Sequence, residues 1–546
     1  MPSSRRSFLE QAAAIGLLYG TKQAFGQQQT TPGMKMPSAA DQAARSAAPS
    51  PNPPHVGPPM LHTLALAPFV DALPLPEVIR PTLKNGRRSI SVTMQEVHAK
   101  VHRDVPLTRM WSYGLNALAP LIEARAGEAL DITWNNNLPT KHFLPIDYSL
   151  HGCGHDVPDV RAIVHLHGAK VPSKDDGYPE DWFVPGQSRT CHYAFDQDAT
   201  ALWYHDHAMG INRINTYAGL FGMLLLRDAV EDSLHLPSGK YEVPLIFYDR
   251  DFTAAGELFY DVSGDPASPW IPEFSADGLL VNGKIRPYLE IEPRLYRFRL
   301  LNTANSRFFN LALTHNQSFF QIGSDQGLLA SPVEMKRLIL GCAERADILI
   351  DFSKSAGETL HMRTGAFDIL EFRVAKQTGA PTVTSVPKTL RTIERIPESA
   401  AVKTRTHTLH EYQDEAARPM VMLINRKHWH EPTTEFPKLN STEIWEFVNL
   451  TEDTHPMHMH LVRFQVLDRR SFDITDYLLN KKLRFTAPAA AAEPHEMGWK
   501  DTVQCPPGTI TRIIVPFEGY PGKYLYHCHI LEHEANDMMR PFEVVA

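Results

Sequence analysis

Cysteine, excess positive charge and long apolar runs are all scarce in this chain of 546 residues. Its five cysteines are too few for a disulfide-dense scaffold. Acidic side chains outnumber basic ones, 62 to 54, whereas a nucleic-acid-binding protein normally carries a basic excess. No stretch reaches the roughly 18 consecutive apolar residues that a membrane-spanning helix needs. We therefore expect neither a nucleic-acid partner nor a membrane span.

Histidine and proline, by contrast, are plentiful, with 26 and 43 residues. Many prolines indicate loops and edge strands, because proline cannot donate to the hydrogen-bond ladder of a central strand. Short apolar or alternating runs lie between turn-forming residues, for example at 130–134, 222–226, 294–300 and 511–515. Long helical periodicity is scarce. The pattern predicts an all-β protein built from sandwiches or barrels.

The N-terminal residues have the composition of an export signal. Residues 1–26 combine the pair Arg5-Arg6, a mildly apolar stretch and small residues, which is typical of a bacterial twin-arginine signal peptide. Residues 27–60 are rich in Gln, Ser, Ala and Pro and are predicted to form a flexible leader. We expect export through the twin-arginine machinery to the periplasm or the cell exterior.

The remaining chain divides into three β units. Polar residues and several prolines make 376–402 a predicted linker, and a softer break follows residue 235. The predicted units are 61–235, 240–375 and 403–546. Histidine is concentrated in the outer two, because the middle unit holds only His315 between residues 240 and 360. The outer units are therefore expected to carry the chemistry and the middle one to act as a spacer.

Histidines recur two residues apart far more often than chance allows. The chain has five His-x-His pairs, where random placement of its histidines would give about one. Alternate residues of a strand point to the same face, so each pair presents two imidazoles together. Four pairs lie in apolar, strand-like settings: His165/His167, His205/His207, His458/His460 and His527/His529. They predict neighbouring metal ions. The fifth pair, His428/His430, lies in a charged stretch and is predicted to be a surface turn.

The C-terminal segment 526–538 carries a second kind of donor set. On a strand, Cys528 faces away from the histidines on either side of it, so one strand can serve two sites. Cys528, His533 and Met538 supply a thiolate, an imidazole and a thioether, and His455 is the obvious second imidazole. Two histidines, one cysteine and a weak axial methionine hold blue copper. The alternatives, a buried apolar cysteine and a packing methionine, do not explain this joint spacing.

These motifs resemble the signature of the multicopper oxidases, over most of the chain after residue 60. The resemblance is greatest to the bacterial spore-coat laccase and bilirubin-oxidase branch. Further matching strings are 176–179, 203–209, 281–283, 286–288, 321–325 and 529–534. The resemblance implies three cupredoxin domains, each a β-sandwich, and four copper ions per chain.

The resemblance also implies a role for each candidate residue. It assigns the type 1 copper to His455, Cys528, His533 and axial Met538. It assigns the type 2 copper to His165 and His458. It assigns the type 3 pair to His167, His205, His207, His460, His527 and His529. Asp176 and Glu534 match carboxylates that relay protons to oxygen in the family, although either could instead be a solvated surface charge.

The implied activity is that of a laccase-like oxidase. Such an enzyme removes single electrons from phenols or aromatic amines and reduces dioxygen to water. A cuprous-ion oxidase is the first alternative, but its usual Met-rich insert is absent, since the 17 methionines are scattered. Bilirubin-oxidase-like activity also stays open. A copper-free scaffold or a nitrite reductase fits less well with a full ligand set. Cys153 and Cys191 could form a disulfide or remain buried thiols.

Overall fold

Strands are the main element of the fold, as the short alternating runs predict. The computed structural model describes residues 57–84, 86–263, 270–376, 385–413 and 419–546. The predicted signal peptide, most of the predicted leader and part of the predicted linker lie outside the described residues. The four runs singled out in the sequence all coincide with strands, namely β6, β10, β16 and β31.

The first unit contains two sheets. Their strands are β1 (Val78–Ile79), β2 (Leu83–Lys84), β3 (Arg87–Ala99), β4 (Thr108–Ser112), β5 (Leu121–Arg125), β6 (Leu130–Asn137), β7 (Val164–His167), β8 (Ser188–Tyr193), β9 (Thr200–Asp206) and β10 (Phe221–Arg227). One sheet has the order β1-β5-β10-β9-β7, and the other has the order β2-β3-β6-β8 with β4 beside β3. Helices α3 (Asn212–Ala218) and α4 (Ala229–Ser233) flank β10 in the sequence.

The second unit also contains two sheets. Its strands are β11 (Glu242–Phe252), β12 (Leu258–Phe259), β13 (Gly278–Val281), β14 (Lys284–Ile285), β15 (Tyr288–Ile291), β16 (Leu295–Asn302), β17 (Phe309–Leu313), β18 (Phe319–Ser324), β19 (Gly327–Met335), β20 (Arg337–Leu340), β21 (Arg345–Asp351), β22 (Thr359–Thr364) and β23 (Phe367–Val374). The sheet orders are β14-β13-β11-β16-β21-β18-β19, with β12 beside β11, and β15-β23-β22-β17-β20. Asn282 and Gly283, both at positive φ, form the tight turn between β13 and β14.

The third unit repeats the arrangement. Its strands are β24 (Lys403–Gln413), β25 (Pro419–Ile424), β26 (Thr442–Asn449), β27 (His455–Met459), β28 (Gln465–Ser471), β29 (Ala490–Ala491), β30 (Thr502–Cys505), β31 (Thr509–Pro516), β32 (Gly522–Cys528) and β33 (Met539–Val544). The sheet orders are β25-β24-β26-β31-β28-β29 and β30-β27-β32-β33. Helices α5 (Ile474–Asn480) and α6 (Leu531–Ala535) complete the third unit. Across the described chain, short 3₁₀ helices lie at Thr63–Ala65, Ser173–Asp175, Gly239–Tyr241, Thr314–Asn316, Glu398–Ala400 and Pro494–Glu496.

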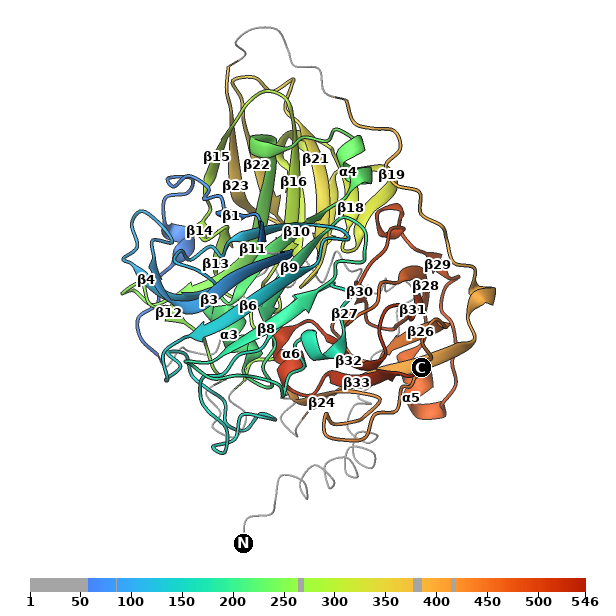
Figure 1. The fold of residues 1–546 in the computed structure, drawn as a ribbon. Helices are drawn as coiled ribbons and strands as arrows, with labels where there is room; N and C mark the ends of the chain where they lie inside the picture. The colour runs from blue at the N-terminus through green and yellow to red at the C-terminus, as the bar shows by residue number, and fades with distance from the viewer. Residues whose placement is uncertain (1–56, 85, 264–269, 377–384, 414–418) are drawn as a thin grey trace, which may run out of the picture.

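The three units pack around one continuous apolar core. Along β6, Leu130, Ile132 and Trp134 are buried while the side chains between them are partly exposed, which is the alternation expected of a strand with one face on a core. The third unit lies beside the first, where α6 contacts α3 (Figure 1). The all-β prediction is confirmed. The predicted domain boundaries themselves stay predictions.

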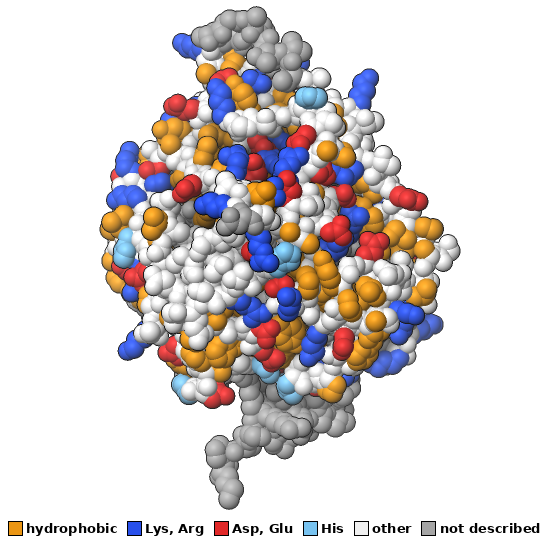
Figure 2. Space-filling model, in the orientation of Figure 1, with side chains coloured by type: hydrophobic (Ala, Val, Ile, Leu, Met, Phe, Trp, Pro, Cys, Tyr) orange, Lys and Arg blue, Asp and Glu red, His pale blue; other side chains and the backbone are white. Residues whose placement is uncertain are grey.

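The surface carries charged side chains of both signs, in keeping with the modest net charge of −8. On the face drawn in Figure 2, acidic and basic side chains are interspersed with apolar and uncharged ones. Among the described helices, none combines the length and the apolar character that a membrane crossing requires. All five cysteines are buried free thiols, so Cys153 and Cys191 are not joined.

Candidate metal centres

Sheet register brings the histidine pairs together. At the edge of the first sheet, β7 runs antiparallel to β9 with His165 opposite His205. In the third unit, β27 runs antiparallel to β32 with His458 opposite His527. Directly opposed residues of an antiparallel pair have their side chains on the same face. Each outer unit therefore presents its two pairs as one group of imidazoles.

The two groups face each other across the contact between the first and third units. The ring of His167 stacks on that of His458, with centroids 3.6 Å apart, and His165 stacks on His460 at 3.8 Å. Three sets of nitrogen atoms each lie within 4.8 Å of one another: His165/His167/His205, His165/His458/His460 and His207/His460/His527. His529 joins them, with its ring centroid 5.1 Å from that of His167. All eight predicted trinuclear histidines thus lie in one buried cluster.

The chemistry of this cluster fits metal ions. One nitrogen of several rings is held by a carbonyl, as where His458 Nδ1 donates to the Asp501 carbonyl at 2.8 Å and His165 Nδ1 donates to that of Asp176 at 2.6 Å. The other nitrogens of these rings, both Nε2, have no hydrogen-bond partner within the described structure. The same holds for His205 Nε2, His529 Nε2 and His167 Nδ1. Buried polar atoms without partners are costly, and metal ions would satisfy them.

Burial also sets the protonation state of these rings. Burial lowers the pKa of four imidazoles well below the ordinary value, those of His167, His205, His458 and His460. Neighbouring imidazoles lower these pKa values further. The rings are therefore neutral near pH 7. Neutral imidazole is the form that binds a metal ion.

A second donor set lies at the other face of β32. Cys528 Sγ lies 3.5 Å from His455 Nδ1 and 3.7 Å from His533 Nδ1, and the two nitrogens are 3.2 Å apart. These edges suit one ion about 2 Å from each donor. Burial raises the pKa of the Cys528 thiol well above its ordinary value, so a bound cation is needed to hold the thiolate. Met538 is fully buried nearby, and its carbonyl accepts from the Cys528 N–H at 3.0 Å.

Two outer contacts orient the imidazoles of this second set. His455 Nε2 lies 2.7 Å from Thr451 Oγ1, and His533 Nε2 lies 2.9 Å from Glu273 Oε1. Each contact holds the far nitrogen and so turns Nδ1 toward Cys528. Partial loss of hydration, together with the nearby carboxylate of Glu411, raises the pKa of Glu273 to about 7. The His533 ring itself is fully buried, whereas Glu273 is 43% exposed, so this carboxylate connects the ring to the solvent-facing surface.

The two predicted carboxylates are buried against the histidine cluster. Asp176 Oδ2 accepts from His460 Nδ1 at 2.7 Å, and burial raises the pKa of this aspartate. Glu534 lies 3.2 Å from His527 Nδ1 and accepts from Asn212 Nδ2 at 2.6 Å. Burial would raise the pKa of Glu534, but the neighbouring imidazoles outweigh it and lower the pKa to about 2. Neither residue is a solvated surface charge.

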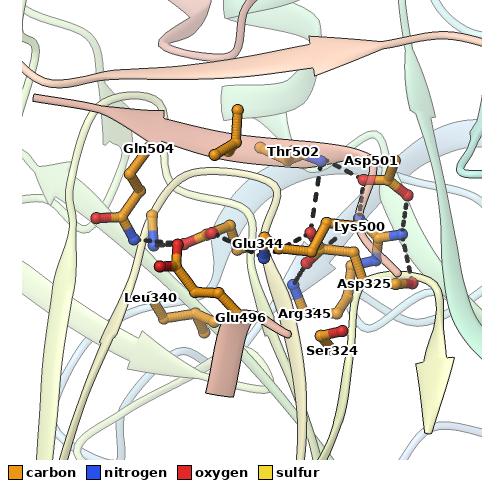
Figure 3. Close-up of polar contacts among 12 residues, drawn as sticks. Ser324, Asp325, Leu340, Glu344, Arg345, Glu496, Lys500, Asp501, Thr502 and Gln504 are labelled. Atoms are coloured by element: carbon orange, nitrogen blue, oxygen red, sulfur yellow. Dashed lines mark hydrogen bonds and ion pairs between the residues drawn. The ribbon is translucent and has the colours of Figure 1, made fainter. Parts of the chain in front are cut away.

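A buried ionic network that includes Asp325, Arg345 and Asp501 (Figure 3) contacts the histidine cluster through Asp501. Asp501 Oδ1 accepts from His167 Nε2 at 3.0 Å and from Arg345 Nη1 at 2.8 Å. Lys500 Nζ lies 2.8 Å from Asp325 and 3.1 Å from Glu344. Arg345, Asp325 and Glu344 belong to the second unit, whereas Lys500 and Asp501 belong to the third. The network therefore connects a ligand candidate of the first unit to both other units.

Comparisons with known proteins agree with this geometry. Two multicopper oxidase family models match this chain, one at residues 157–231 and the other at residues 400–546. A laccase from Bacillus subtilis (strain 168) is 43% identical over 509 residues, covering 88% of this chain and 99% of the relative. The chain belongs to the multicopper oxidase family. It is accordingly a copper-dependent oxidoreductase of the laccase-like kind.

More distant relatives and solved structures extend the match. Multicopper oxidase LPR1 from Arabidopsis thaliana is 34% identical, covering 87% of this chain and 93% of the relative. A laccase structure from Pediococcus acidilactici Pa5930 matches with a TM-score of 0.72 at 26% identity, covering 88% of this chain and 96% of that one. McoA multicopper oxidase from Aquifex aeolicus matches with the same TM-score at 28% identity, covering 87% and 99%. The predicted cupredoxin fold is confirmed by these neighbours.

The predicted site residues lie together in the structure, but the sequence analysis did not identify several of the residues that contact them. Thr451, Glu273, Asp501 and Arg345 follow no repeated spacing, and Asp501 meets His167 across 334 residues. No local pattern could have identified them. His428 and His430 belong to neither candidate donor set, and His430 is exposed and lies in a turn, as predicted.

Proposed function

We propose that this oxidase takes single electrons from phenols or aromatic amines at His533 and delivers them to dioxygen at the histidine cluster. The observation that carries the proposal is the placement of Cys528, the last residue of β32, between His527 and His529 in the chain. Its side chain belongs to one donor set, and its two neighbours belong to the other. Electrons therefore need to cross only a few covalent bonds. The balanced reaction is four phenols and one dioxygen giving four phenoxyl radicals and two waters.

We assign four copper ions to the chain on the same grounds. His455, Cys528, His533 and axial Met538 would hold type 1 copper. His165 and His458 would hold type 2 copper, and the type 3 pair would take His167, His205, His207, His460, His527 and His529. When bound, these ions supply one-electron oxidation at the type 1 site and four-electron reduction of dioxygen at the other three.

The remaining residues orient ligands and hold protons. Asp176 accepts a hydrogen bond from His460 Nδ1, and Glu534 lies against His527 Nδ1, so both carboxylates are placed to take up protons and pass them on next to the cluster. Glu273 accepts a hydrogen bond from His533 Nε2, which fixes the ring with Nδ1 toward Cys528. The apolar surroundings of Cys528 keep water from the thiolate.

Copper quantitation with an absorption spectrum tests this proposal. We expect four coppers per chain and a blue colour from the Cys528 thiolate. Cys528→Ser should remove the colour and the turnover while the fold is retained. A blue Ser variant, or a chain with one copper only, would contradict the assignment.

A cuprous-ion oxidase is the second candidate, and one observation favours it. The exposed carboxylate of Glu273 contacts the buried ring of His533, and Asp453 lies close to both, so a cation would be attracted here rather than a neutral phenol. Steady-state rates with a panel of phenols and with Cu(I) separate the two activities. A kcat/KM for Cu(I) far above that for every phenol would make metal oxidation the better description.

Export is the last part of the proposal. Arg5 and Arg6 before an apolar stretch would direct the folded chain to the twin-arginine machinery and out of the cytoplasm. Replacing both arginines by lysine should leave the precursor in the cytoplasm. Cell fractionation measures where the double variant accumulates. Export equal to that of the parent chain would count against this route.

A further inference from the structure

The pair His428/His430 takes no part in either candidate centre, yet it lies beside a third imidazole and a carboxylate. His428 Nδ1 lies 2.6 Å from Asp537 Oδ2, and His151 Nδ1 lies 4.0 Å from the other oxygen of that carboxylate. The rings of His428 and His430 are nearly parallel, with centroids 5.7 Å apart, and His430 faces His151 in the same way at 5.8 Å. We call His151, His428, His430 and Asp537 the surface histidine cluster.

The turn that carries two of these histidines is fixed from the interior. Arg540 is only 1% exposed, and its guanidinium donates to four carbonyl oxygens of the turn, those of His428, Trp429, Glu431 and Pro432. A buried guanidinium must keep its donors paired, so the turn cannot move without a large cost. The Trp429 side chain adds a second anchor, because it is buried in an apolar cluster. The imidazoles are thus presented on a rigid backbone.

The other two members of the cluster are held as firmly. Gly152 and Gly210 both have positive φ, and their missing side chains let the loop of His151 approach closely, since a Cβ at Gly152 would lie 2.4 Å from the Met209 side chain. Asp537 has φ of 75°, a left-handed conformation that is uncommon outside glycine. Such a conformation persists only where the surroundings hold it, and here it aims the carboxylate at His428.

We propose that the surface histidine cluster binds one divalent transition-metal ion of the Zn²⁺ or Cu²⁺ class. Imidazole nitrogen and carboxylate oxygen are the donors that these ions prefer, and three nitrogens with one oxygen are enough for a four-coordinate site. The four donor atoms do not yet lie within 4.8 Å of one another, so the side chains must turn toward a common ion. Mg²⁺ and Ca²⁺ are disfavoured because they take oxygen ligands. His151 and His428 are 31% and 26% exposed, so an ion can reach them and the rings can rotate to close around it. This site shares no residue with the proposed copper centres, although Asp537 directly precedes Met538.

Zn²⁺ is the probe that tests this site, because it has no redox chemistry and cannot serve as a substrate. Calorimetric titration and equilibrium dialysis of the copper-loaded chain should find one saturable Zn²⁺ per chain, with the copper content unchanged. His430→Gln and His151→Gln should each weaken Zn²⁺ binding by at least the roughly 10- to 100-fold that loss of an outer partner of a metal ligand costs.

A matched control comes from another exposed histidine that pairs with an aspartate. His192 Nδ1 lies 2.7 Å from Asp131, outside the surface histidine cluster, and His192→Gln should leave Zn²⁺ binding unchanged. Zn²⁺ binding that is absent, or equal in the parent chain and both cluster variants, would overturn the proposal. So would Zn²⁺ uptake that occurs only with release of copper. A chain found to hold no copper would refute the proposed function but not this site.

Discussion

Replacing Arg345 by methionine should destabilise the protein and empty the histidine cluster selectively. Arg345 is 1% exposed, and its guanidinium donates to both carboxylate oxygens of Asp501 and to the carbonyls of Ala201 and Asp325. Methionine keeps the side-chain stem but leaves the Asp501 charge buried without its partner. Removing one member of a buried ion pair costs about 3–5 kcal/mol of unfolding free energy.

The selectivity follows from what Asp501 touches. Its carboxylate accepts from His167 Nε2, and its carbonyl accepts from His458 Nδ1, so it orients two proposed ligands. Loss of such an outer partner lowers metal affinity roughly 10- to 100-fold. Within the described structure, His455 and Cys528 form no hydrogen bond to this network, so they should keep type 1 copper. We expect the Arg345→Met chain to stay blue while losing up to three of its four coppers.

Copper analysis per chain, the blue absorbance and denaturant unfolding measure these effects together. Arg469→Met is the matched control, because Arg469 donates to both oxygens of Glu496 at 2.7 Å in a buried pair that touches no proposed ligand. It should cost similar stability without selective copper loss. Equal copper loss in the two variants, or full copper retention in Arg345→Met, would refute the reasoning.

Three further predictions concern other parts of the chain. Met538→Leu keeps the side-chain volume and should lower the free energy of unfolding by under about 1.5 kcal/mol. Loss of the thioether should raise the redox potential of the type 1 copper. An unchanged potential in a redox titration would show that Met538 only packs in the core. Glu273→Gln removes a charge next to His533 and should lower kcat/KM for Cu(I) roughly five- to tenfold, about 1 kcal/mol, while kcat/KM for phenols changes far less. Equal losses of kcat/KM for Cu(I) and for phenols would show that Glu273 does not attract the cation. Burial would raise the pKa of Glu496, but Arg469 outweighs it and lowers the pKa from 4.5 to about 2. The ionised carboxylate therefore contributes about 3 kcal/mol to the free energy of unfolding above pH 4.5, and this contribution is lost as the pH falls toward 2. Glu496→Gln should remove this loss of stability at acid pH, as measured by denaturant unfolding.

The ligand candidates could be predicted because a strand converts spacing into direction. Two residues apart means the same face, so His165 and His167 had to point together wherever β7 lay. Neighbouring residues of a strand point to opposite faces, so the sequence alone predicts that Cys528 and His527 serve different sites. The sequence also predicts the strands themselves, since turn residues and alternation are local properties. These parts of the site rest on short-range chain geometry alone.

The partners of the ligands could not be predicted, because their contacts are set by how the units dock. Glu273 meets His533 across 260 residues, and Arg345 meets Asp501 across 156. A single glutamate or arginine on a loop or strand carries no periodic signal, and most such residues are solvated surface charges. The same limit hid the surface histidine cluster, since His151 has no spacing relation to His430.

The middle unit is therefore more than the spacer that its lack of histidine suggested. It supplies Glu273 beside His533 at one centre and Arg345 beneath Asp501 at the other. An outer partner fixes the orientation of a ligand ring without occupying a coordination position, so a unit with no ligand can still govern two metal centres. Because both contacts cross unit boundaries, correct docking of the second unit should be a condition for a complete copper complement. The ligand-poor unit and the ligand-rich ones then depend on each other for function as well as for packing.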